Sequence, residues 1–282
     1  MQSSSANKRA NGKVWHTFVV FILFAYLFLP VMATFLFSIS TEWQNTILPE
    51  GLTLQWYAKL FTDERFLLAL GRSFLVAILT VVSSLVIMVP TIFVTAVYFP
   101  RLEKVLQTIV LLPFALPGVV AAVGLIKLYS SGPFAISGTI WILLGIYFIV
   151  ILPYVYQSIR NSLRAINAIE LMEAAEVLGA GKMKAFLRVV VPNIIPGVLV
   201  AGLLSFSIIF GEFVLANMLV GGSYETIQVY LFRMQSTDGH ASSATIITFF
   251  ALIFVLYAFV LKIGSMKPRV HVPTAGEEEE AA

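Results

Sequence analysis

Six apolar runs dominate this sequence and limit what it can fold into. A helix that crosses the hydrocarbon core of a bilayer needs roughly 20 mainly apolar residues. Six stretches are long enough: 17–39, 72–98, 105–129, 138–159, 194–220 and 243–264. Charged residues make up only 12% of the chain, against about 25% in soluble domains. The chain therefore has too few charged side chains to cover a surface that faces water. The sequence therefore predicts an all-α integral membrane protein with six transmembrane helices.

The first run resembles the start of a secretory signal peptide, because Lys8, Arg9 and Lys13 precede it. Its apolar stretch is much longer than the roughly 7–15 residues of a signal core, so we expect an uncleaved first helix. The chain has no cysteine, which excludes disulfides and thiolate metal sites. No basic face with interleaved aromatic residues lies outside the apolar runs, so nucleic acid is not an expected partner.

The basic residues predict how the spans are oriented, because cytoplasmic flanks carry an excess of Lys and Arg. With the N-terminus inside, Lys127 lies within a span and four basic residues face outward: Lys59, Arg65, Arg72 and Arg233. The others gather on the inner side: Lys8, Arg9, Lys13, Arg101, Lys104, Arg160, Arg164, Lys182, Lys184, Arg188, Lys262, Lys267 and Arg269. We therefore expect a multi-pass protein, surrounded by membrane lipid, with both termini in the cytoplasm.

The polar segments between the runs complete the predicted organisation. Residues 52–70 (LTLQWYAKLFTDERFLLAL) have the spacing of an amphipathic helix on the outer face, and residues 221–242 contain a GGSYE turn and a short helix, IQVYLFRM. The stretch LLPFALPG in the third run predicts a bend that lines a cavity. Three parts follow: a cytoplasmic segment (1–16), a transmembrane domain (17–265) and a disordered cytoplasmic tail (266–282) that ends in EEEEAA.

The segment 160–193, between the fourth and fifth runs, is polar although its neighbours are apolar. Within it AINAIELMEAAEVLGA is rich in helix formers, and four apolar residues fall roughly along one helical face: Ile166, Ile169, Met172 and Val177. Gly179 and Gly181 predict a helix end and a turn. A second helix, KMKAFLRVVV, then leads through Pro192 into the membrane. On composition alone, the segment is either a solvated hairpin or a knob that docks on a cytoplasmic partner.

One motif in this segment resembles the signature of permease subunits of bacterial ABC importers. The pattern is E-A-A, three residues, Gly, nine residues, then I-x-L-P, and its positions here are Glu173, Ala174, Ala175, Gly179, Val189, Val191 and Pro192. Val189 and Val191 replace the usual Ile and Leu. Two further stretches, WQNTILPEGLTLQWYAKLF and SSGPFAISGTIWILL, resemble the permeases of the spermidine/putrescine and 2-aminoethylphosphonate group.

The resemblance implies a MetI-like ABC importer permease fold in a bacterial inner membrane. In that family the loop forms a coupling helix seated in a groove of a cytoplasmic ATPase subunit, with Glu173, Ala174, Ala175, Gly179 and Pro192 at the matching positions here. The chain itself has no Gly-rich GKS/GKT phosphate loop, so ATP hydrolysis is expected in a partner ATPase dimer. A second permease, similar or identical, and an extracytoplasmic solute-binding protein are also implied.

The resemblance leaves the solute open. A polyamine or a 2-aminoethylphosphonate is the expected class, and ferric iron and thiamine, which related permeases carry, stay possible. No cofactor is expected.

Glu212 is the one carboxylate well inside a predicted span, and Lys127 is the one interior amine. A charge near the centre of a transmembrane helix costs on the order of 3 kcal/mol, so such residues are candidates for a translocation path. Glu212 can line the path or form an ion pair with Lys127, and Lys127 can also extend to the membrane interface.

Other classes of function have less support from the residues. An ion-coupled secondary transporter would need ionisable groups within its spans or broken helices for ion coupling. Two interior charges give this reading little support, and it would leave the long inner loop unexplained. A membrane-embedded enzyme would need convergent acids, histidines or a metal set. The three histidines are scattered without companion acids: His16, His240 and His271. We therefore expect neither catalysis nor a metal site in this chain.

Overall fold

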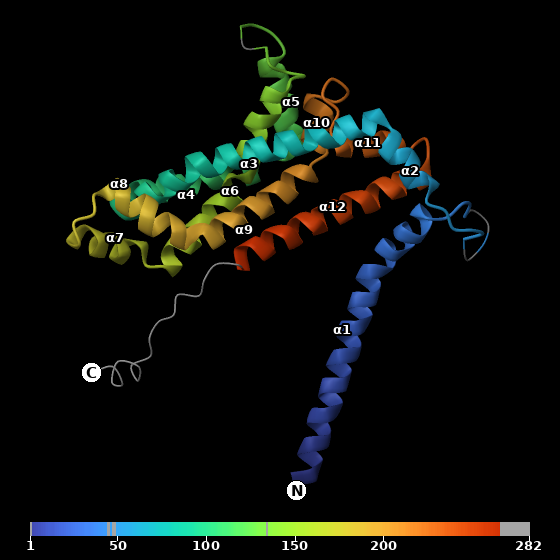
Figure 1. Ribbon diagram of the computed structural model, residues 1–282, viewed down its shortest axis with the longest axis horizontal. Helices are drawn as coiled ribbons and strands as arrows, with labels where there is room; N and C mark the ends of the chain where they lie inside the picture. Colours follow the sequence, from blue (N-terminus) through green and yellow to red (C-terminus); the bar gives the residue numbers. More distant parts are fainter. Residues whose placement is uncertain (1, 44–45, 47–48, 134, 266–282) are drawn as a thin grey trace. The chain divides into compact units, whose positions relative to one another are not determined.

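The computed structural model describes residues 2–43, 46, 49–133 and 135–265 (Figure 1). Helices make up most of these residues, and no β-strand forms among them beyond one isolated bridge between Ser40 and Leu52. The all-α prediction is therefore confirmed. The predicted tail, 266–282, lies outside the described residues.

Five helical stretches in the described part of the chain are long and apolar enough to cross a bilayer. They are Trp15–Ser38 in α1 (Gln2–Ser38), Glu64–Tyr98 (α3), Ile140–Ala165 (α6), Lys182–Phe210, and Gly239–Lys262 in α12 (Gly239–Ser265). A sixth segment consists of two helical pieces, Pro100–Ala115 and Gly118–Tyr129, that meet at an angle of 96°. Six spanning segments are obtained when this bent pair is counted as one.

The third predicted span, 105–129, consists of two helices with a bend between them. Helix α4 (Pro100–Leu111) passes into a 3₁₀ turn (Leu112–Ala115), and α5 (Gly118–Tyr129) then leaves at a steep angle (Figure 1). Pro117 adopts an extended conformation (φ −58°, ψ 138°) and has no N–H to continue the helix. The bend predicted from LLPFALPG is confirmed, and residues around it line an open pocket of about 440 Å³.

The fifth span differs from the predicted range 194–220 at both ends. It begins at Lys182, because α8 (Lys182–Ala185), a π-helical stretch (Phe186–Val190) and α9 (Val191–Phe210) are continuous. The π-helical stretch ends two residues before Pro192, which removes an N–H from the helical ladder. The helix ends at Phe210, and a separate short helix, α10 (Val214–Leu219), follows the break.

The predicted amphipathic helix over 52–70 is broken at Asp63. Helix α2 (Gln55–Thr62) ends there, and α3 begins at Glu64. Asp63 has an extended backbone (φ −77°, ψ 109°), and its Oδ1 accepts the backbone N–H of Arg65 at 2.9 Å. This capping of α3 makes the second half of the predicted surface helix the beginning of the second span. The short helix expected at IQVYLFRM is confirmed as α11 (Ile227–Met234).

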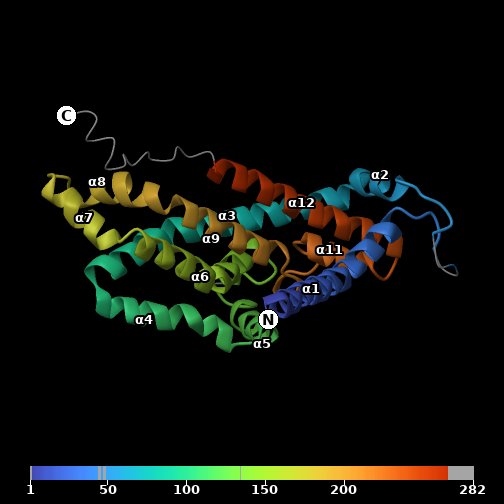
Figure 2. The ribbon, with the colours of Figure 1, turned by 90° about the horizontal axis from the view of Figure 1, so that it is seen from below.

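The chain divides into two compact units. The first comprises residues 1–73 and 221–251, and the second comprises 74–220 and 252–282. In the second unit α6 packs along α9, and α10 packs against α5 and α6 (Figures 1 and 2). The α6–α9 packing is very tight at Gly197, where an added Cβ would lie 1.7 Å from Ser162 Oγ. Small residues allow helix backbones in membranes to approach this closely.

Polar contacts hold α3 and α11 together within the first unit. The buried carboxylate of Glu225 accepts two hydrogen bonds from Arg65, at 2.7 and 2.8 Å, and lies 3.3 Å from Arg233 Nη1. The hydroxyl of Tyr230 donates to Asp63 Oδ2 at 2.7 Å. Burial, and then the hydrogen bond to Asp63, raise the pKa of Tyr230 above that of an exposed phenol.

Candidate functional site

Helix α7 (Ala168–Val177) carries the E-A-A motif, and a left-handed residue sets its direction. Helix α6 extends to Ala165, six residues past the predicted end of the fourth span. Asn167 then adopts φ 48° and ψ 56°, a region that Asn tolerates better than most residues. This conformation turns the chain sharply from α6 into α7. Helices α7 and α8 contact one another at one end of the second unit (Figures 1 and 2).

Three residues of α7 form its buried face. Ala168, Met172 and Ala175, spaced four and three residues apart, pack into the protein, as one face of an α-helix requires. Of the four apolar residues that fall roughly along one helical face in the sequence, Met172 is buried, whereas Ile169 and Val177 are exposed. Ala175 therefore packs within this chain, while Glu173 and Ala174 remain open to a partner.

Helix α7 ends at a glycine with a left-handed backbone conformation. Gly179 has φ +81°, its N–H donates to Glu176 O at 2.9 Å, and the Ala180 N–H donates to Ala175 O at 2.9 Å. These two bonds form a Schellman motif, in which the residue after the helix adopts the left-handed conformation that glycine favours. The helix end predicted at Gly179 is confirmed.

An exposed apolar tip, formed by Val177 and Leu178, was missed by sequence reasoning. Each of these side chains is 87% exposed, directly before the turn at Gly179. The available signal was an apolar pair next to a helix-ending glycine, which periodicity alone assigns to the core. Acidic and basic residues surround this tip in the sequence: Glu173, Glu176, Lys182 and Lys184. Such charges indicate an aqueous location and not the hydrocarbon core.

Glu212 lies in the break between α9 and α10, and not within a continuous helix. Its Oε2 accepts the Tyr147 hydroxyl at 2.9 Å, and its carboxylate accepts the backbone N–H groups of Leu215 at 2.7 Å and Ala216 at 3.0 Å. The carboxylate therefore joins α6 to the start of α10. Lys127 is exposed in the last turn of α5. Among the described residues no ion pair links it to Glu212.

His240 is held by aromatic packing. Its ring stacks on Phe37 and Trp56, with ring centroids 4.1 and 5.1 Å away, and its Nδ1 lies 2.9 Å from Phe37 O. Within the described part of the chain, no group of three or more His, Cys, Asp or Glu residues is placed to hold a metal ion.

A family model described as the binding-protein-dependent transport system inner membrane component matches residues 66–265. This chain belongs to that family. The match covers all described spans except α1, together with the E-A-A segment. The chain is therefore a multi-pass inner-membrane permease subunit of an ABC importer. Such components are transporters and not enzymes.

Two groups of relatives resemble the chain over most of its length. The Salmonella typhimurium permease PhnV, named for a 2-aminoethylphosphonate transport system, is 28% identical over 252 residues, which cover 89% of this chain and 91% of PhnV. The spermidine/putrescine permease PotC of Haemophilus influenzae is 25% identical over 218 residues, covering 77% and 83%. The resemblance to these two permease groups, predicted from the sequence, is confirmed.

Solved structures confirm the permease fold. A bacterial ABC transporter involved in the import of the acidic polysaccharide alginate aligns with a TM-score of 0.66 and 16% identity, covering 88% of this chain and 95% of the other. The bacterial alginate transporter in complex with a periplasmic protein bound to an alginate pentasaccharide aligns with a TM-score of 0.61 and 20% identity, covering 87% and 92%. At such identities the likeness establishes the MetI-like fold alone.

Proposed function

We propose that this permease carries a small solute of the polyamine or 2-aminoethylphosphonate type, and that a separate cytoplasmic ATPase drives it through α7. The observation that supports docking at α7 is the apolar tip, Val177 and Leu178, which projects beyond a well-capped helix among charged residues. The relatives' names support the solute class, because both permease groups are named for small amine-bearing molecules.

The apolar tip gives α7 a physical reason to bind a soluble protein. Burial of apolar surface contributes roughly 25 cal/mol per Å², and a short helix with an apolar patch suits a hydrophobic groove. Glu173 and Ala174 are exposed on the same helix, so a carboxylate and a small residue accompany the tip into the groove. Ala175, on the buried face of the same helix, packs against the rest of this chain.

The packing of α7 provides a route for force to reach the spans. Its inner face is anchored by Met172 and Ala175, and beyond the Gly179 turn one continuous helix runs from Lys182 to Phe210. That helix contacts α6 closely at Gly197. We infer that movement of the ATPase displaces α7 and α8 together, and that the displacement passes into α9 and α6.

The remaining partners and the orientation belong to the same proposal. A binding protein delivers the solute at the outer face, a second permease completes the path, and both termini lie in the cytoplasm, as the excess of Lys and Arg on the inner flanks indicates. The periplasmic protein seen with an alginate transporter supports the first of these partners. Membrane lipid surrounds α1, because the apolar side chains of its spanning part (Trp15–Ser38) are not buried by other described residues.

A pull-down from detergent-solubilised membranes tests the docking surface. Tagged wild-type protein should retain an ATPase subunit, whereas Glu173→Lys and Leu178→Asp should lose it. Leu54→Asp is a matched control, because Leu54 is also an exposed leucine (71%) but lies on the predicted outer side. Loss of the ATPase from the control as well, or retention by all variants, would exclude α7 as the docking site.

Glu212 is proposed to act at the break between α9 and α10, where it either lines the path or holds α10 during gating. Its three hydrogen bonds favour the second role, because a carboxylate that accepts all three has fewer lone pairs left for a solute. Glu212→Gln and Tyr147→Phe should both reduce uptake if α10 must be held. Reduced uptake in Glu212→Gln with normal uptake in Tyr147→Phe would instead indicate direct contact with the solute.

A further inference from the structure

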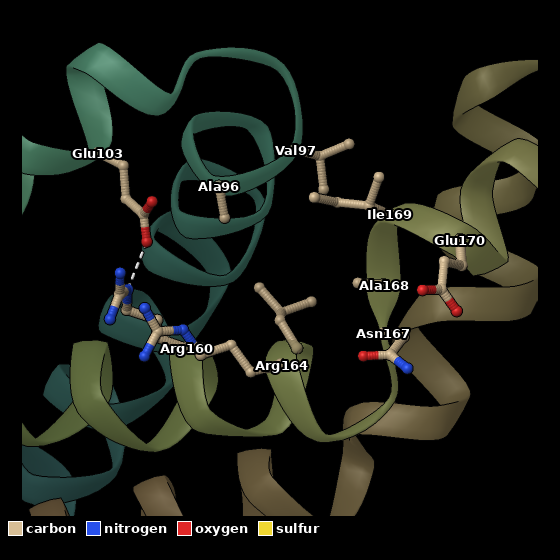
Figure 3. Close-up of a pocket in the computed structure, with 10 residues that line it drawn as sticks. Ala96, Val97, Glu103, Arg160, Arg164, Asn167, Ala168, Ile169 and Glu170 are labelled. Carbon is tan, nitrogen blue, oxygen red and sulfur yellow. Dashed lines mark hydrogen bonds and ion pairs between the residues drawn. The ribbon is translucent and has the colours of Figure 1, made fainter.

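A cavity of about 470 Å³ lies behind the coupling helix, within the second unit (Figure 3). Its walls come from the end of α3, the first turn of α4, the last turns of α6 and the first turn of α7. Four segments distant in the sequence therefore meet here, next to the left-handed turn at Asn167. Ala168, Ile169 and Glu170, in the first turn of α7, form one wall, and the E-A-A motif lies further along the same helix.

One end of this cavity holds more positive than negative charge. Arg160 donates from Nε to Glu103 Oε1, and these side chains are only 14% and 17% exposed. The Arg164 side chain extends toward Arg160 in Figure 3, and both residues line the cavity together with Glu103. Among the described residues the side chain of Arg164 makes no hydrogen bond or ion pair, whereas its backbone oxygen accepts the N–H of Asn167 at 3.1 Å. The other acid of the cavity, Glu170, lies on the far side beside Asn167 (Figure 3).

This arrangement suits a tetrahedral oxyanion. Glu103 engages Arg160 through Nε, which leaves N–H groups of that guanidinium and the whole fork of Arg164 available. Guanidinium forks bind phosphate oxygens in a bidentate manner. Arg160 is also the first charge after the long apolar stretch of α6, so the cavity lies where lipid headgroups meet the inner ends of the spans. Basic pockets between transmembrane helices on the cytoplasmic side commonly bind lipid phosphates.

We propose that this cavity binds the phosphate group of an anionic ligand, through Arg164 and the free N–H groups of Arg160. The bound anion fixes α7 against the ends of α4 and α6, and so sets how firmly the coupling segment is held. The second statement rests on the proposed role of α7 in coupling, whereas the binding itself does not.

Two sources of phosphate are separated by two measurements on the purified full-length protein. The first is native mass spectrometry of retained phosphatidylglycerol, with phosphatidylcholine as the neutral comparison. The second is the shift in melting temperature on addition of inorganic phosphate in neutral detergent. Arg164→Gln should weaken binding at least about tenfold, because a charge-assisted contact is lost. Retention of phosphatidylglycerol alone by the wild type identifies a lipid headgroup, and a response to inorganic phosphate identifies a soluble ligand.

Arg101→Gln is the matched control, since it removes one positive charge from α4 without altering the lining of the cavity. Arg164→Lys keeps the charge but not the planar fork, so it should bind more weakly than the wild type and better than Arg164→Gln. It also provides a test if Arg164→Gln does not fold. Equal binding by the wild type and the Arg164 variants, or equal loss in Arg101→Gln, would overturn the proposal. No ATPase is present in either measurement, so failure here is distinct from failure of docking at α7.

Discussion

Replacement of Gly179 tests whether backbone conformation or steric space governs the end of α7. An added Cβ at this position would meet no atom within 4 Å, yet φ is +81°. A side chain there is therefore free of clashes but requires a left-handed backbone. That conformation costs about 1–2 kcal/mol for most residues and less for Asn, whose short polar side chain tolerates it. The expected order of tip stability is glycine, then Asn, then Ala, although Asn is larger than Ala.

The magnitude can be followed by hydrogen exchange of the amides that close the turn. The N–H groups of Gly179 and Ala180 are held by Glu176 O and Ala175 O. A cost of about 1–2 kcal/mol changes an opening equilibrium by roughly 5–30-fold. Gly179→Ala should therefore accelerate exchange of Ala180 by about that factor in the purified protein, while Gly179→Asn should change it by only a few fold. Because no partner is needed, the measurement is independent of the ATPase.

The same variants should rank identically in coupled uptake once the ATPase is present. A steric origin would give the opposite order, with Ala tolerated better than Asn, because Ala is smaller. Equal exchange in Gly179→Ala and the wild type would show that the left-handed turn does not limit the stability of the tip. Either result would refute the conformational reasoning.

Three further outcomes follow from the packing of each unit. Gly197→Ala should destabilise the protein by about 1–3 kcal/mol through overpacking of α6 against α9, seen as a lower melting temperature, whereas Gly145→Ala, which meets no atom within 4 Å, should not. Glu225→Gln should cost about 1–3 kcal/mol because it weakens charge-assisted hydrogen bonds to a buried carboxylate, whereas Lys59→Gln, at a 3.8 Å surface ion pair, should cost little. The raised pKa of Tyr230 means that the folded protein holds the phenol proton more tightly, so thermal stability should fall as the pH rises above about 10, and Tyr230→Phe should reduce that slope.

Each of these outcomes has a contrary result. Equal melting temperatures for the Gly197 and Gly145 variants would contradict the close helix contact. A larger loss in the Lys59 variant than in the Glu225 variant would contradict the importance of burial. An unchanged alkaline slope in Tyr230→Phe would assign the pH dependence to other groups.

The sequence by itself determined that the chain lies in a bilayer, how many apolar spans it has, and where the E-A-A segment lies. These depend on local properties: the length of an apolar run, the preference of Gly179 for positive φ, and the spacing of the motif from Glu173 to Pro192. Each can be recognised without knowledge of distant residues, because bilayer thickness and backbone sterics act on a few consecutive residues.

Only the tertiary structure decided where the spans break and which side chains meet. Asp63 divides the expected surface helix by capping α3, and Glu212 is joined to Tyr147, 65 residues earlier, in a break that hydropathy does not reveal. The cavity beside α7 likewise brings Glu103 together with Arg160 and Arg164. Such features arise because helices select their buried faces by packing against partners distant in the chain, and a one-dimensional pattern of apolar residues does not contain those contacts.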